Sequence, residues 1–165
     1  MDFRETDEQT MIREMVRDFA ESILPPTIEE RDKHQIPPTE EWKRFCDETG
    51  LQGITISEDY GGMPVDDVSE AIIIEELARV DPSFSVFYAV HVGLCSKTIT
   101  LHGTDEEKDQ YLTQLSADKV GAYSLSEAGA GTDAAALSCK AELSDDGSHY
   151  ILNGMKMWVT NGASA

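Results

Sequence analysis

A short loop between two extended segments carries the residue types best suited to holding a ligand. Residues 126–133 read Ser-Glu-Ala-Gly-Ala-Gly-Thr-Asp. Glycines let backbone amides approach a planar or anionic ligand, and the short polar side chains at both ends of the loop can form hydrogen bonds to it. The loop therefore indicates a ligand-binding turn, although a plain glycine-rich β-turn would have the same composition.

The same loop contains the pattern Gly129-x-Gly131-x-x-Ala134, which matches the dinucleotide fingerprint of Rossmann domains. That fingerprint must open a helix whose N-terminus holds a pyrophosphate. Here the following residues alternate between apolar and polar side chains, which is typical of a strand. The strand that ends near Asn153 also lacks an acidic residue for a ribose. We therefore do not expect a Rossmann nucleotide site.

The chain before about residue 118 is predicted to be helical. A capping box at residues 6–9 precedes an apolar stripe at helical spacing, and Pro25-Pro26 ends that helix. Further helices are expected between Pro26 and Pro37, from Thr39 to Gly50, over 66–80, over 83–101 and after a second capping box at 104–107. The segment 83–101 is apolar on nearly all sides, so we expect it to be buried.

After about residue 118 the hydrophobic period changes from 3.6 to 2, which predicts strands over 120–125, 137–143, 150–153 and 155–160. The pairs Asp146-Gly147, Asn153-Gly154 and Asn161-Gly162 are typical of turns. Three or four strands with free edges rarely form a self-sufficient domain, so we expect this β part to be incomplete.

Four segments, in order along the chain, resemble the acyl-CoA dehydrogenase family. Residues 123–133 (YSLSEAGAGTD) and 150–162 (YILNGMKMWVTNG) closely resemble the paired flavin-binding motifs of that family, and residues 59–62 and 75–83 look like two further segments. The resemblance implies an α+β fold, with an all-α N-terminal domain over 1–118 and an incomplete antiparallel β-barrel-like middle domain over 119–165. In complete members a C-terminal four-helix domain follows, and FAD lies between it and the β domain.

The resemblance also implies a role for residues of the loop. Tyr123, Leu125 and Ser126 would line the FAD, with the Ser126 hydroxyl on the pyrimidine edge. Gly131 and Thr132 would lie near the pyrophosphate and the thioester-pantetheine arm of an acyl-CoA, where the Thr132 hydroxyl would contact the substrate. Donors at the pyrimidine edge stabilise the negative charge of a flavin that accepts hydride.

The second motif supplies three more expected contacts. Trp158 would pack beside the isoalloxazine, Thr160 would hydrogen-bond near its reactive N5, and Val159 lies between them. We therefore expect residues 126–133 and 158–160 to meet in space around the ring. Without the resemblance, Trp158 would be expected in a core or cross-strand contact, and Tyr123 and Thr160 as ordinary strand residues.

Other conspicuous residues are expected to be structural. An apolar set on the 83–101 helix could wall an acyl-chain cavity, but a buried helix needs the same composition: Phe87, Tyr88, Val90, Val92 and Leu94. Adjacent Glu75 and Glu76 do not face each other on a helix, so we expect both on a solvated face. The four histidines show no ligand spacing, and no metal site is expected.

No catalytic residue is assigned. In the family a carboxylate base from the C-terminal domain removes the substrate α-proton while the β-hydride goes to flavin N5, and none of the 165 residues corresponds to that domain. One departure within the motif is Ala128, which stands where many relatives have proline and should loosen the loop slightly.

Composition excludes several classes of protein. Thirteen Lys and Arg against 32 Asp and Glu give a formal net charge of −19, which argues against nucleic-acid binding and against anchoring on anionic lipid. No stretch reaches the roughly 18 apolar residues of a membrane helix, and residues 1–5 resemble neither a signal nor a transit peptide. Three widely spaced cysteines indicate free thiols in a reducing compartment, and we expect a cytoplasmic protein.

The leading hypothesis is the N-terminal part of an FAD-dependent acyl-CoA dehydrogenase. The resemblance implies α,β-desaturation of acyl-CoA thioesters, transfer of electrons to an electron-transfer flavoprotein, and a homo-oligomer (tetramer or dimer) when complete. The 165-residue chain alone is expected to be inactive. The alternatives are a non-catalytic helical binding module, a subunit of a split enzyme, and a related flavoenzyme such as an acyl-CoA oxidase or a nitroalkane oxidase.

Overall fold

The computed structural model describes residues 4–165, so the expectation about a targeting signal at residues 1–5 falls largely outside the described residues. The helices are α1 (Asp7–Ile23), α2 (Pro25–His34), α3 (Thr39–Thr49), α4 (Asp67–Val80), α5 (Pro82–Ala89), α6 (Lys97–His102) and α7 (Asp105–Ala117). Short 3-10 turns are η1 (Leu51–Gly53), η2 (Glu58–Tyr60) and η4 (Ala134–Ala136), and η3 (Val90–Ser96) is a π-helical segment. The strands are β1 (Lys140–Leu143) and β2 (Tyr150–Asn153). The α+β fold class is confirmed.

The expected helix boundaries follow from hydrogen bonds at the helix ends. Thr6 and Thr104 each form the predicted capping box, and the side chains of Asp66 and Asp81 accept two backbone N–H groups each at the starts of α4 and α5. Gly50, at φ +69°, ends α3 in the left-handed region that glycine tolerates. Local sequence therefore sets where most helices begin and end.

Helices α1, α3, α4 and α5 enclose the main hydrophobic core. Its centre is a group of aromatic rings in mutual contact: Phe19, Trp42, Phe45, Phe84, Phe87 and Tyr88. Tyr88 is fully buried and donates its hydroxyl to the Leu51 carbonyl, while Val92 is fully buried as well. Tyr88 and Val92 are therefore core residues.

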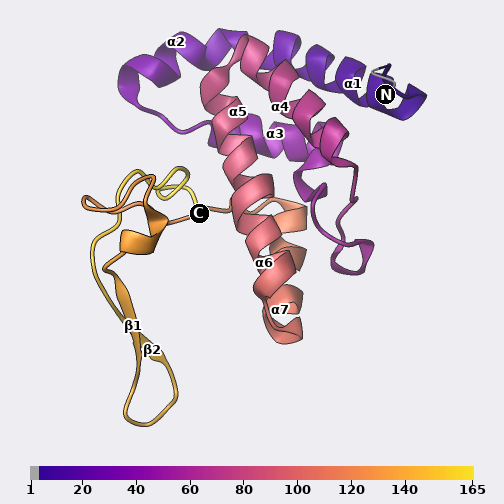
Figure 1. The fold of residues 1–165 in the computed structure, drawn as a ribbon. Coiled ribbons are helices and arrows are strands. Elements are labelled where there is room, and N and C mark those ends of the chain that lie inside the picture. Colours follow the sequence, from indigo (N-terminus) through magenta and orange to yellow (C-terminus); the bar gives the residue numbers. More distant parts are fainter. Residues whose placement is uncertain (1–3) are drawn as a thin grey trace.

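Segments α5, η3 and α6 form one continuous rod through the helical part (Figure 1). By length and composition this rod, Pro82–His102, also satisfies the requirements of a membrane span, with a mean hydropathy of 1.3, contrary to our expectation. Its buried polar groups indicate a core helix instead. The buried His91 accepts the Gly121 N–H at Nδ1 (2.9 Å), and its Nε2 contacts the Gln52 carbonyl (3.1 Å), which can only accept, so Nε2 carries the proton.

A buried carboxylate joins α1 to α4. Glu76 has a side chain only 2% exposed, and it accepts hydrogen bonds from Arg13 and Arg17 of α1 and from Arg79 of α4. These donors, led by Arg17, lower the pKa of Glu76 to about 2 against the opposing effect of burial. The expectation of a solvated face holds for the exposed Glu75 and is wrong for Glu76, because a one-residue shift on a helix turns the side chain toward α1.

The β part is smaller than expected. Only β1 and β2 pair, antiparallel, with Lys140 opposite Asn153 and Leu143 opposite Tyr150, and Asp146-Gly147 forms the predicted turn. The hairpin projects away from the helices (Figure 1), and all of its strand residues are exposed. Residues 120–125 and 155–160 are not strands, and 137–139 precede the strand proper. Strands need a ladder of backbone hydrogen bonds with a neighbouring edge, and within residues 4–165 the only such bond that joins the first two stretches is the one from the Met157 N–H to the carbonyl of Ser126, next to the first stretch.

Replacing the buried carboxylate should reveal how much it contributes to stability. Glu76→Gln leaves three guanidinium groups facing a neutral side chain, and we expect the free energy of unfolding to fall by about 3 kcal/mol. Urea unfolding followed by circular dichroism measures the change. The matched control is Glu75→Gln on the exposed neighbour, for which we expect less than about 0.5 kcal/mol. Equal effects of the two substitutions would contradict this assignment.

The buried imidazole should make stability fall in mild acid. Burial lowers the pKa of His91 from its ordinary 6.5 to about 4. The unfolded chain takes up a proton below about pH 6.5, whereas the folded chain does so only near pH 4, so stability that is complete above this window is lost as the pH falls through it. We expect a loss of about 3 kcal/mol. His91→Gln should remove this slope in urea unfolding across the window, and the exposed-residue control His102→Gln should keep it.

Candidate functional site

The structure brings the glycine-rich loop and the second motif side by side. The Met157 N–H donates to the Ser126 carbonyl (2.8 Å), and the Asn161 side-chain amide donates to the Gly121 carbonyl (2.9 Å). The later residue of one segment thus contacts the earlier residue of the other. The segments 121–126 and 157–161 therefore run in opposite directions. Tyr123 and Leu125 therefore lie along the same stretch as residues 158–160.

The loop itself closes on a short turn. The Glu127 N–H donates to the Ala130 carbonyl (3.0 Å), and the Ala130 N–H donates back to the Glu127 carbonyl (3.1 Å). The residues that follow form only the single 3-10 turn η4 before β1 begins. No α-helix starts after the loop, so the arrangement differs from a Rossmann fingerprint, as the sequence predicted.

Glu127 of the loop belongs to a cluster of polar groups that we call the Glu127 cluster: Glu127, Ser138, Cys139 and Lys156. The Glu127 side chain accepts the Lys156 ammonium (2.8 Å), the Ser138 N–H (2.8 Å) and hydroxyl (2.7 Å), and the Cys139 N–H (2.9 Å). These contacts, that of Lys156 foremost, lower the pKa of Glu127 to about 2. The carboxylate is therefore ionised at neutral pH.

Several predicted contact residues retain free binding capacity. Within residues 4–165, no hydrogen bond is formed by the side-chain hydroxyls of Ser126, Thr132 or Thr160. A side-chain atom added at Gly129 or Gly131 would meet nothing within 4 Å, so the loop backbone is open to a ligand. Unused hydroxyls beside open backbone fit the polar atoms of a flavin and its phosphates.

Trp158 presents an apolar surface next to these groups. Its side chain is 85% exposed, and its backbone lies in the left-handed region at φ +58°. The core or cross-strand contact expected for an ordinary strand tryptophan is therefore absent among the described residues. An indole held this far out of the core is available to stack on a planar ligand.

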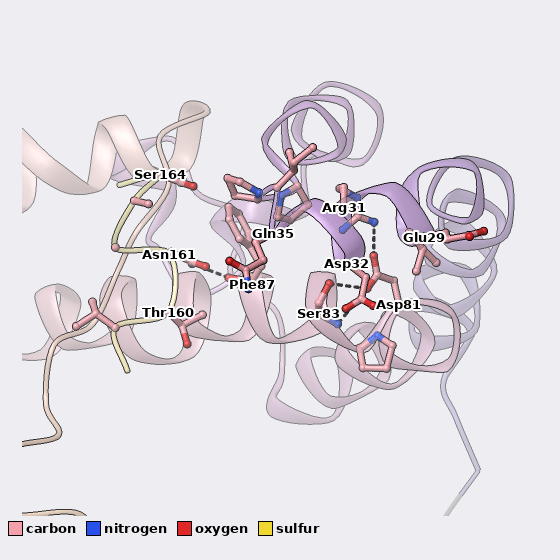
Figure 2. Close-up of a pocket in the computed structure, with 18 of the residues that line it drawn as sticks. Glu29, Arg31, Asp32, Gln35, Asp81, Ser83, Phe87, Thr160, Asn161 and Ser164 are labelled. Atoms are coloured by element: carbon pink, nitrogen blue, oxygen red, sulfur yellow. Dashed lines mark hydrogen bonds and ion pairs between the residues drawn. The ribbon is translucent and has the colours of Figure 1, made fainter. Parts of the chain in front are cut away.

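A pocket of about 920 Å³ (Figure 2) contains only two of the predicted residues. Val159 and Thr160 lie on one wall, and α2 together with the start of α5 forms the other. The remaining six lie outside it: Tyr123, Leu125, Ser126, Gly131, Thr132 and Trp158. The predicted site is thus an open surface that reaches one edge of the pocket.

The opposite wall of the pocket is fixed by a buried ion pair. Asp81 is 1% exposed, and it accepts hydrogen bonds from Arg31 of α2 and from Ser83 and the Phe84 N–H of α5 (Figure 2). Burial opposes ionisation of Asp81, but these donors lower its pKa below the usual value. Arg31, Asp81 and Ser83 thus bind each other. The same wall also contains Glu29, Asp32 and Gln35, whose side chains form no hydrogen bond within residues 4–165.

Three residues of the site received no role from the sequence: Glu127, Lys156 and Asn161. Besides its bond to Gly121, the Asn161 amide donates to the Phe87 carbonyl (2.9 Å) and so joins the second motif to α5. A signal was present for the other two, because Lys156 is the only charged residue of the stretch 150–162 and Glu127 is one of only two, with Asp133, in the stretch 123–133. Among residues 4–165 no group of three or more potential metal ligands lies together.

The chain matches known proteins along its whole length. The family model for the acyl-CoA dehydrogenase N-terminal domain matches residues 6–119. The short-chain specific acyl-CoA dehydrogenase of Clostridium acetobutylicum is 42% identical over 100% of this chain and 43% of its own length.

Two solved structures are also similar in fold. An acyl-CoA dehydrogenase complexed with FAD from Bacillus anthracis superposes with a TM-score of 0.90 at 37% identity, covering 98% of this chain and 28% of that one. A chain in a structure of the electron transferring flavoprotein of Acidaminococcus fermentans gives a TM-score of 0.91 at 42% identity, covering 100% and 43%. The chain thus spans less than half the length of each of these relatives, and it belongs to the acyl-CoA dehydrogenase family.

Proposed function

We propose that the chain supplies the helical domain and the first part of the flavin-binding domain of an FAD-dependent acyl-CoA dehydrogenase. The observation that carries the proposal is the contact between the two motifs, where Met157 binds Ser126 beside hydroxyls that no other described residue uses. Family membership and the FAD complex of the relative from Bacillus anthracis support it.

Each predicted residue then has a specific task. Ser126 offers its hydroxyl, with Tyr123 and Leu125 beside it, to the pyrimidine edge of the flavin. Gly131 and Thr132 hold the pyrophosphate and the pantetheine arm of the substrate. Donors placed in advance at these positions need no reorientation during the reaction, so their effect on a developing negative charge is large.

The second motif forms the other side of the ring site. Trp158 covers the isoalloxazine and excludes water from it, Thr160 donates its hydroxyl near N5, and Val159 fills the space between them. A bound flavin supplies the acceptor for the substrate hydride. The carboxylate base that removes the α-proton is expected from a part of the enzyme outside these 165 residues.

The proposed substrate is an acyl-CoA thioester, and the proposed electron acceptor is an electron-transfer flavoprotein. The similarity to a short-chain specific dehydrogenase and to a chain in an electron transferring flavoprotein structure supports both. The complete enzyme is proposed to be a homo-oligomer.

Flavin content and turnover test the proposal. The 165-residue chain should show little or no bound flavin and no acyl-CoA-dependent dye reduction. Co-expression with the remaining C-terminal part of the Clostridium acetobutylicum relative should restore a yellow flavin and turnover. A flavin-free complex, or a folded chain that takes a different partner, would favour the binding-module alternative, and rapid reaction of the reduced flavin with oxygen would favour an oxidase.

Trp158 should report flavin binding directly. The chain has two tryptophans, and Trp158 is exposed while Trp42 is buried, so Trp158 is the one that an isoalloxazine can reach. In the co-expressed complex we expect FAD to quench the Trp158 emission and Trp158→Phe to weaken FAD binding about 10-fold, in line with a lost aromatic contact. The difference in quenching between the unmodified complex and the Trp158→Phe complex isolates this residue. No difference would contradict its proposed position beside the ring.

A further inference from the structure

The Glu127 cluster joins the proposed flavin loop to residues 138–139 and to Lys156, and the proposed function gives it no task. Glu127 is 8% exposed, which is unusual for a carboxylate in a part of the chain where most side chains are exposed. Burying a charge costs free energy unless it is paired and hydrogen-bonded. A charge retained at such a position therefore points to a specific structural purpose.

Both carboxylate oxygens are occupied by the protein. Oε1 accepts the Lys156 ammonium and the Cys139 N–H, and Oε2 accepts the N–H and hydroxyl of Ser138. Since all four donors belong to the chain, the carboxylate is not positioned to take a proton from a substrate. The carboxylate instead holds the backbone of the segments that it joins in place.

Lys156 extends the cluster to the residue before the flavin loop. Its ammonium also donates to the Leu125 carbonyl (2.9 Å), and the next residue, Met157, donates to the Ser126 carbonyl (2.8 Å). Two consecutive residues of the second motif thus hold two consecutive carbonyls of the first. Trp158 follows directly, so its position depends on the same contacts.

We infer that Glu127 is a positioning residue for the flavin site: with Lys156 it fixes the loop, the residues that lead into β1 and the segment leading to Trp158 as one unit. The inference rests on the proposed function, because the loop is the one assigned to FAD. The turn between Glu127 and Ala130 passes this constraint on to Gly131 and Thr132, which follow it immediately. Loss of the Lys156 charge should leave the buried Glu127 carboxylate without an ionic partner, and loss of the Glu127 charge should leave the half-buried Lys156 without one. Either change should release all three segments together.

The first test measures the order of the three segments in the full 165-residue chain. In Glu127→Gln and Lys156→Met we expect the amides of Ser138, Cys139 and Met157 to exchange hydrogen at least about 10-fold faster, with exchange in α4 unchanged. Lys156→Arg retains the charge and should restore most of the protection.

The exposed β1 residues provide matched controls. Glu142→Gln and Lys140→Met make the same charge changes on neighbouring residues of the hairpin, and we expect them to leave exchange of these amides unchanged. Unchanged protection in Glu127→Gln, or a loss spread evenly over the helices, would overturn the inference.

The second test measures the FAD dissociation constant of the same variants in the complex with the completing C-terminal part. We expect Glu127→Gln and Lys156→Met each to weaken FAD binding at least about 10-fold. The double variant should bind FAD no more weakly than the single variant with the lower affinity, because the two residues act as one unit. Near-normal binding by Lys156→Arg distinguishes positioning from a general loss of stability.

The two tests separate the inference from the proposed function. Released amides with unchanged FAD affinity would show that the cluster orders the hairpin without positioning the flavin site, and would overturn the inference. If the unmodified complex takes up no flavin, the proposed function fails and the positioning of a flavin site fails with it, while the exchange measurement still shows whether Glu127 joins the three segments.

Discussion

A carboxylate shielded from water must be balanced by several donors, and this requirement organises the chain at three places. Glu76 draws Arg13 and Arg17 of α1 against α4, Asp81 holds α2 against the start of α5, and Glu127 holds the two motif segments and the residues that lead into β1 together. In each case at least one donor comes from a distant part of the sequence. Removing one partner is costly because the other remains buried and charged, so each group favours one arrangement of its segments.

The same constraint explains the contrast between the two walls near the pocket. Around Asp81 the donors and acceptors bind each other, which fits a structural role. Around the loop, the buried Glu127 carboxylate engages Lys156, Ser138 and the Cys139 N–H, and the hydroxyls of Ser126, Thr132 and Thr160 stay unused among the described residues. The buried polar groups are thus hydrogen-bonded within the protein, while these hydroxyls remain available as donors. A polar, planar ligand requires this arrangement.

The helical part has a buried hydrophobic core of its own, whereas most side chains of the β part are exposed. Aromatic rings from α1, α3 and α5 meet in one core, and the buried His91 ties that core to Gly121, where the chain leaves the helices. The hairpin instead exposes all of its strand residues, and the Trp158 side chain is exposed as well. Exposed apolar strands are typical of surfaces that another part of a protein covers, in agreement with relatives that are more than twice as long.

Much of this protein was determined by local sequence. Capping residues, prolines and the period of apolar side chains depend on near neighbours, so the helices, the Asp146-Gly147 turn and the fold class could be predicted, and the order of four motifs indicated the family. Strands at 120–125 and 155–160 were predicted wrongly, because alternation shows that a segment can be a strand but not that a partner edge is present. Only the tertiary structure decided that Glu76 is buried, that Glu127 meets Lys156 across 29 residues, and that Met157 binds Ser126. Those contacts join segments that are far apart in the sequence. Whether two such segments meet depends on how all of the intervening chain folds.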